Sequence, residues 1–213
     1  IYDLNVRVED AGRISDSKIL MLTSGLEIKH QLICGSDDLL KFGQPAGMKL
    51  IVTNTGLKPV QNLTLKIISA DSLLNISDSL FTVALLEPAQ SLTIPAVFSF
   101  GLKHSLPNDF PVMITLQGHS GQRSWRKDVE FPVAAPEISI QAPHVIDGDN
   151  NVMDLGEVAD LVVSLKNSGS LEADDLEISL VSDDTLVRIL SSSSIPIDIC
   201  DAFSMNEFRF QIK

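Results

Sequence analysis

The stretch MKLIVTNTGLKPVQNLTLKIIS, residues 48–69, alternates apolar and polar residues on either side of a short polar break. Side chains of a strand point to opposite faces at every second residue, so this alternation is typical of strands with one buried face. The break, Asn54-Thr55-Gly56, is of a composition that favours a turn with positive φ. The stretch therefore predicts two strands separated by a turn.

The same pattern returns in LVVSLKNSGSLEADDLEISLVS, residues 161–182. The offset between the two copies is 110 residues before an acidic loop, 113 after it and 110 again at the end. We therefore expect the second copy to carry three extra residues in its opening loop. The matched pairs are Gly43 with Gly156, Asn54 with Asn167, Gly56 with Gly169 and Ile76 with Ile189.

A period of this length is the size of a whole β-sandwich domain rather than of a solenoid unit. No segment combines a helical apolar stripe with helix caps. The predicted fold is all-β, with tandem antiparallel Ig-like β-sandwiches. The predicted domains are a closing β-hairpin of a preceding repeat at 1–26, a complete sandwich at 27–136, and a second sandwich without its closing hairpin at 137–213.

The closing hairpin of the complete sandwich is predicted from residues 110–133, with a turn near Gly121 and Val129, Phe131 and Val133 on one face. Residues 1–26 follow the same plan, with a turn near Gly12. A sandwich without this hairpin exposes an apolar face and a sheet edge, and an isolated hairpin is barely stable in water. We expect head-to-tail self-association through residues 1–26; the alternative is that both ends result from excision from a longer chain.

The net charge of −12 is unevenly distributed. Residues 137–213 hold 15 acids and 4 bases, whereas residues 1–136 hold 13 acids and 12 bases. This balance argues against nucleic acid and anionic membrane surfaces as partners, because both recruit Lys and Arg. No apolar run is long enough for membrane insertion, and the two distant cysteines do not indicate a disulfide framework.

The loop HVIDGDNNVMDLGE, residues 144–157, is the best candidate for a ligand site. Calcium prefers six to eight oxygen ligands, and this loop is rich in carboxylates and amides. It departs from an EF-hand, because Val152 stands where the sharp turn requires glycine. The alternative is a polar turn whose side chains bond the backbone. The candidate calcium ligands are Asp147, Asp149, Asn151, Asp154 and Glu157.

Catalysis is not expected from this sequence. None of the four histidines belongs to a metal-binding pair, and no nucleophile elbow or phosphate-binding glycine loop is present. His30 and Cys34 share a strand parity, but no orienting group accompanies them as a nucleophile pair requires. We therefore predict a protein that is not an enzyme and requires no cofactor.

The segment LGEVADLVVSLKNSGSLEADDLEISLVSDDTLVRI, residues 155–189, resembles Ig-like repeats of secreted and cell-surface proteins of Bacteroidetes-type bacteria. It is similar to CARDB-type adhesion domains and to the sandwich domains that follow gingipain-type cysteine peptidases. The shared plan is an acidic loop, Gly-Glu, an apolar strand, Asn-x-Gly and a second strand. The first copy departs from it, since Gln44 stands where the plan has Glu157.

The resemblance implies a location outside the cell or on the bacterial cell surface. It implies a non-catalytic spacer or adhesion module of a larger exported protein, with that protein's other domains and an extracellular protein or glycan as partners. The alternative is an accessory region of a secreted gingipain-type peptidase. A calcium-stiffened binding module is a further alternative.

Overall fold

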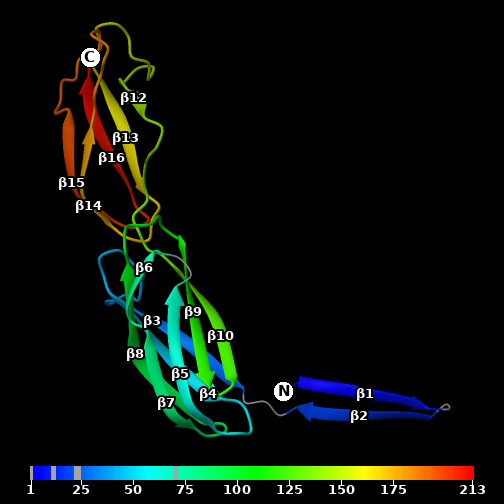
Figure 1. Ribbon diagram of the computed structural model, residues 1–213. Coiled ribbons are helices and arrows are strands. Elements are labelled where there is room, and N and C mark those ends of the chain that lie inside the picture. Colours follow the sequence, from blue (N-terminus) through cyan, green and yellow to red (C-terminus); the bar gives the residue numbers. More distant parts are fainter. Residues whose placement is uncertain (1, 11–12, 22–24, 70–71) are drawn as a thin grey trace. The chain divides into compact units, whose positions relative to one another are not determined.

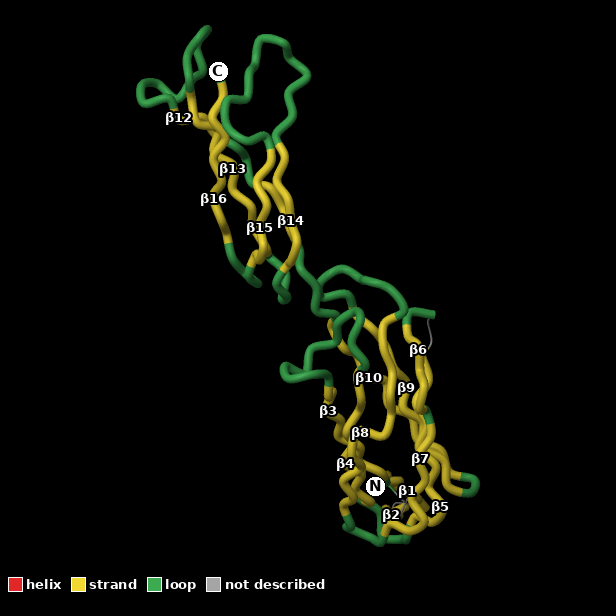
Figure 2. Tube along the Cα trace, turned by 90° about the vertical axis from the view of Figure 1, so that its left-hand side faces the viewer, coloured by secondary structure: helices red, strands yellow, loops and turns green. Residues whose placement is uncertain are grey.

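The computed structural model describes residues 2–10, 13–21, 25–69 and 72–213, with side chains described from residue 25 onward. These ranges are all-β, built of strands and loops (Figures 1 and 2). No helix within them is long and apolar enough to cross a membrane. The predicted all-β fold is therefore confirmed.

The strands in chain order are β1 (Tyr2–Asp10), β2 (Arg13–Met21), β3 (Leu26–Ile33), β4 (Ala46–Asn54), β5 (Val60–Ser69), β6 (Leu74–Asp78), β7 (Leu80–Leu86), β8 (Ser91–Leu102), β9 (Pro111–Ser120), β10 (Arg123–Pro132), β11 (Ile138–Ile140), β12 (His144–Ile146), β13 (Ala159–Asn167), β14 (Ala173–Ser179), β15 (Ser194–Cys200) and β16 (Met205–Ile212). The strand pairs whose register is described are all antiparallel. Strands β1 and β2 form a two-stranded sheet of their own, and the predicted turn near Gly12 lies outside the described residues.

The chain forms two compact units. Unit 1 contains residues 1–104 and 111–131, and unit 2 contains residues 105–110 and 132–213. This division differs from the boundary expected between residues 136 and 137. The reason is a backbone exchange inside unit 2, in which Val133 N donates to Phe110 O and Asp109 N donates to Val133 O.

Apart from the β1–β2 pair, unit 1 consists of two four-stranded sheets, β3-β4-β8-β6 and β10-β9-β5-β7. Only Ser79 separates β6 from β7, so one extended segment passes from the first sheet to the second. Alternate residues of β4, β5 and β9 form the core, as the period-two pattern predicts. The core side chains, each at most 1% exposed, include Met48, Leu50, Val52, Leu63, Leu65, Ile67, Val112, Ile114 and Leu116.

The predicted closing hairpin of unit 1 is confirmed. Strands β9 and β10 are neighbours in one sheet, and Gly121 has φ 59° at their turn. Val129, Phe131 and Val133 are all buried. Phe131 stacks with Phe100 of β8, so β10 packs its apolar face into the core.

Unit 2 has fewer strands. Strand β13 pairs with β11, β12 and β16, and β14 pairs with β15 in a separate two-stranded sheet. The core between these sheets is centred on Phe210 and Cys200, both fully buried. In the described part of the chain, no strand pairs with the edge of β14 opposite β15.

Left-handed residues occur at corresponding points of the two units. They include Asn62 in β5 and Asp175 in β14, each left out of its ladder without a shift in register. The corresponding φ values are 57° and 90° at Gly35 and Gly148, 56° and 59° at Asp38 and Asn151, 83° and 82° at Gly43 and Gly156, 49° and 53° at Asn62 and Asp175, and 62° and 56° at Ala89 and Phe203.

The Asn-x-Gly turns differ from expectation, because neither Gly56 nor Gly169 has a positive φ. The asparagine side chain organises the turn instead. Asn54 Oδ1 accepts from Gly56 N at 3.0 Å, and Asn167 Oδ1 accepts from Gly169 N at 3.0 Å. Gly169 is required for close packing, since a Cβ there would lie 2.7 Å from the carbonyl carbon of Pro136.

Candidate functional site

The acidic loop of unit 2 is organised by the carboxylate of Asp147. Its Oδ1 accepts from Asp149 N at 2.7 Å and from Asn151 N at 3.0 Å, and its Oδ2 accepts from Val152 N at 3.1 Å. These bonds, foremost that from Asp149 N, hold the pKa of Asp147 below its ordinary value, because they favour the charged form. The geometry is that of a carboxylate closing a polar turn.

The other candidate ligands close the far end of the same loop. Glu157 Oε2 accepts from Asp154 N at 3.1 Å, and Glu157 N donates to Asp154 O at 3.1 Å. Within the described ranges, no three His, Cys, Asp or Glu side chains are grouped so that they could hold one metal ion. The calcium hypothesis stays a prediction from the sequence.

The expected three-residue enlargement of this loop is wrong. Matched φ values place residues 147–157 in register with residues 34–44, so the two loops have the same length. The extra length lies in the preceding strand, where β3 is continuous but its counterpart is divided into β11 and β12. Pro143 lies in this interruption, and proline has no N–H for a sheet ladder.

His30 and Cys34 do not have the properties of a nucleophile pair. Burial raises the pKa of the Cys34 thiol, whereas a nucleophilic cysteine needs a lowered pKa. Its Sγ lies 3.7 Å from Pro45 O. The His30 ring packs edge-on against Phe131, with ring centroids 5.8 Å apart. The pKa of His30 is lowered, first by burial and second by the positive charge of Lys127. Both residues contribute to packing in unit 1.

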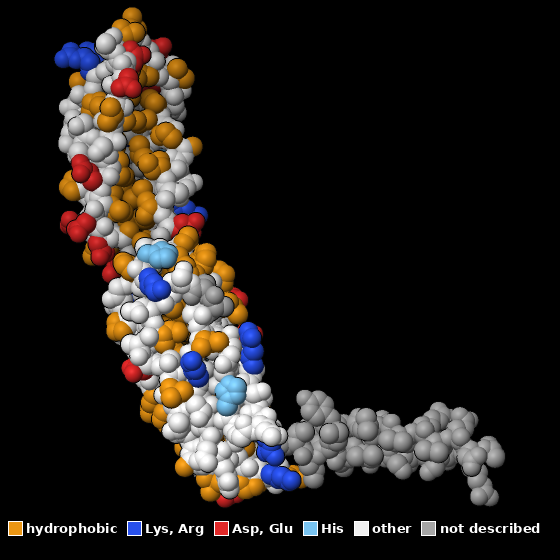
Figure 3. Space-filling view, in the orientation of Figure 1, with side chains coloured by type: hydrophobic (Ala, Val, Ile, Leu, Met, Phe, Trp, Pro, Cys, Tyr) orange, Lys and Arg blue, Asp and Glu red, His pale blue; other side chains and the backbone are white. Residues whose placement is uncertain are grey.

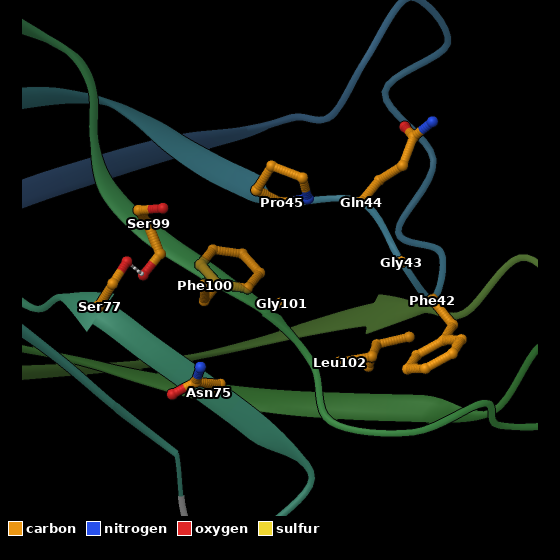
Figure 4. Close-up of a pocket in the computed structure, with 10 residues that line it drawn as sticks. All are labelled: Phe42, Gly43, Gln44, Pro45, Asn75, Ser77, Ser99, Phe100, Gly101 and Leu102. Atoms are coloured by element: carbon orange, nitrogen blue, oxygen red, sulfur yellow. Dashed lines mark hydrogen bonds between the residues drawn. The ribbon is translucent and has the colours of Figure 1, made fainter.

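A shallow hollow of about 270 Å³ lies in unit 1 between the 42–45 segment and strands β6 and β8 (Figure 4). Figure 4 shows Phe42 beside Leu102 at one end and the Ser77–Ser99 hydrogen bond at the other. Its lining has no side chain that is charged at neutral pH. The polar side chains of the hollow are neutral amides and hydroxyls.

An apolar groove of about 560 Å³ lies in unit 2, between β11 and β14. Ile140 is 63% exposed and Ile138 is 38% exposed at one side of it, and Leu176 lines the other. Figure 3 shows a stripe of hydrophobic side chains along a face of unit 2. The sequence predicted an uncovered apolar face here, but the residues that line it follow from the strand pairing.

No protein-family model matches the sequence, and no curated protein matches it. The similarity of residues 155–189 to CARDB-type and post-peptidase sandwiches therefore stays a prediction.

Proposed function

We propose that this chain is a non-catalytic pair of Ig-like sandwiches that acts as a spacer or adhesion module of a larger exported bacterial surface protein. The observation that supports this proposal best is that its candidate reactive side chains make structural contacts. Asp147 bonds three backbone N–H groups, Cys34 has a raised pKa, and His30 packs on an aromatic ring. Each serves the fold.

The matched backbone features of the two units also support the proposal. Both units bury an asparagine that ties its turn to a neighbouring strand: Asn54 Nδ2 donates to Leu86 O at 2.9 Å, and Asn167 Nδ2 donates to Cys200 O at 3.1 Å. Two successive units of one design are what a repeated spacer requires. The resemblance of residues 155–189 supports the location on the cell surface.

Mechanical unfolding of the chain between handles at its two termini tests the spacer role. We expect two separate unfolding events, and unit 1 should give the larger contour-length gain because it releases more residues than unit 2. The same chain pulled in denaturant gives the baseline force–extension curve. A single unfolding event would contradict a spacer made of two units. So would unfolding of both units at forces no higher than those that extend the denatured chain.

A further inference from the structure

The groove of unit 2 corresponds to a filled position in unit 1. Strand pairing identifies the corresponding residues: Ile28 pairs with Val52 in unit 1, and Ile140 pairs with Leu165 in unit 2. Yet Ile28 is 8% exposed and Ile140 is 63% exposed. The same strand position is thus covered in one unit and open in the other.

The β9–β10 hairpin covers the position in unit 1. Strand β9 pairs along β5, with Leu65 opposite Gly118 and Ile67 opposite Leu116. From β10, Lys127 Nζ donates to Ile28 O, and Phe131 packs on His30. The hairpin therefore supplies both the edge partner of β5 and the cover of β3.

Strand β14 is the unit 2 counterpart of β5. Both strands carry a left-handed residue at the corresponding point, Asn62 and Asp175. Each pairs on one side with a later antiparallel strand, β5 with β7 and β14 with β15. The edge that β9 occupies along β5 has no partner along β14 in the described chain. A two-stranded hairpin with one apolar face would fit this edge as β9 and β10 fit unit 1.

The β1–β2 hairpin has that pattern. Its two nine-residue strands pair with each other in register from Tyr2 with Met21 to Asp10 with Arg13. At an offset of 110 residues, its sequence places apolar residues at the positions of the fully buried residues of β9. The matched positions are Tyr2 with Val112, Leu4 with Ile114 and Val6 with Leu116.

We propose that the groove between β11 and β14 binds the β1–β2 hairpin of a second copy of this chain, which adds two strands to the β14–β15 sheet. Transfer of the β5–β9 register places Val8 opposite Ile178 and Arg7 opposite Ser179. The added strand satisfies an open sheet edge, and its apolar residues cover Ile138 and Ile140. This interface is head-to-tail, so it propagates from one copy to the next. The inference does not depend on the spacer role.

Site-directed cross-linking tests the register. One preparation carries Arg7→Cys and the other Ser179→Cys; the native cysteines are at most 1% exposed. After mixing under mild oxidation, mass spectrometry should detect the peptide joining positions 7 and 179. Its yield should be roughly tenfold above the control, because docked groups have millimolar effective concentrations.

In the control mixture, the second preparation carries Asp198→Cys in place of Ser179→Cys. Asp198 is an exposed residue on β15. Equal yields from the two mixtures would overturn the proposal. So would a doubly substituted chain, carrying both Arg7→Cys and Ser179→Cys, that forms the disulfide only within monomers, because the hairpin would then occupy the groove of its own chain.

A second variant tests the groove without relying on cysteine chemistry. Ile140→Lys should weaken self-association at least tenfold in sedimentation velocity, because it places a charge in the apolar groove; tenfold corresponds to about 1.4 kcal/mol. Ile140 is exposed, so the fold should tolerate the change. The control Leu155→Lys, at a residue 98% exposed and outside the groove lining, should associate as the parent chain does. A parent chain that stays monomeric at every concentration would also overturn the proposal.

Discussion

At the scale of single residues, the two buried asparagines do more than mark turns. Asn167 Oδ1 accepts from Gly169 N and Glu137 N, while its Nδ2 donates to carbonyls of Leu171 and Cys200. An amide has both donors and acceptors, which an aspartate or a leucine cannot supply. The side chain thus joins the turn after β13 to the end of β15, in a site from which water is excluded.

Truncation of this amide should be costly. Asn167→Ala leaves several buried backbone groups without partners, and we expect a loss of about 2–4 kcal/mol in the free energy of unfolding of unit 2. Urea titration followed by far-ultraviolet circular dichroism measures it. The matched truncation Asn150→Ala, at an exposed amide in the acidic loop, should cost less than about 0.5 kcal/mol. Similar losses of unfolding free energy in both variants would contradict a stabilising role of the buried Asn167 hydrogen bonds.

The carboxylate of Asp147 should titrate below the ordinary aspartate value of 3.8, because three backbone N–H groups favour its charged form. A folded pKa that is depressed gives stabilisation that is complete above the unfolded pKa and lost as pH falls through the folded pKa. Carbon-13 NMR of the carboxyl group measures the midpoint. Below that midpoint, the amides of Asp149 and Asn151 should lose their hydrogen-exchange protection.

The matched control for the loop is Asp149→Ala, which leaves the Asp147 carboxylate in place. Asp147→Ala should abolish the protection of these two amides at neutral pH, whereas Asp149→Ala should retain it. Unchanged protection in Asp147→Ala would show that the loop does not depend on this carboxylate.

At the scale of elements, alternation predicted the strands well, because burial of one sheet face imposes period two on the sequence. The burial of Val129, Phe131 and Val133 follows from that rule. What alternation cannot supply is the partner of each strand. The passage from β6 to β7 through Ser79 changes sheets without any change of pattern, since both halves remain strands with one buried face.

The acidic loop was mispredicted in length for a related reason. Aligning the two copies shows that the insertion lies between the matched residues Glu137 and Gly156. The alignment does not show where in that interval it lies. Backbone hydrogen bonding decides the place: Gln141 N donates to Ser164 O, and the chain returns to β13 only at His144. The candidate ligands could be read from the sequence, but the use of Asp147 by backbone N–H groups could not, because it depends on φ at Gly148 and Asn151.

The added-strand register makes a prediction at this scale. Thr64 pairs with His119 in unit 1, and transfer of that pair places Glu9 of one copy opposite Glu177 of the next. Like charges directly opposite destabilise a strand pair. Glu9→Lys should therefore strengthen association by about 0.2–1 kcal/mol, as measured by sedimentation velocity.

A control separates this register effect from a change in net charge. Asp3→Lys alters the charge by the same amount, but Asp3 lies beyond the transferred pairs along β14. It should change association less than Glu9→Lys does. Equal effects of the two variants would mean that overall charge, and not the Glu9–Glu177 pair, limits the interaction.

At the scale of the whole molecule, charge and apolar surface lie together in residues 137–213. This region carries 15 acids against 4 bases and also contains the open groove. Residues 1–26 carry 4 acids and 3 bases, so the proposed occupant is nearly neutral. An interface of this kind is held by apolar burial and backbone pairing, while the net charge of −12 on each chain opposes assembly at long range.

Salt should therefore strengthen self-association. The screening length falls from about 30 Å at 0.01 M ionic strength to about 10 Å at 0.1 M, which removes repulsion between chains but leaves the groove contacts intact. Sedimentation velocity across this range should show the dissociation constant falling with added sodium chloride, and Ile140→Lys should remain the weaker associator throughout. Association that weakens with salt would mean that opposite charges hold the copies together, which neither the acidic groove unit nor the near-neutral hairpin provides.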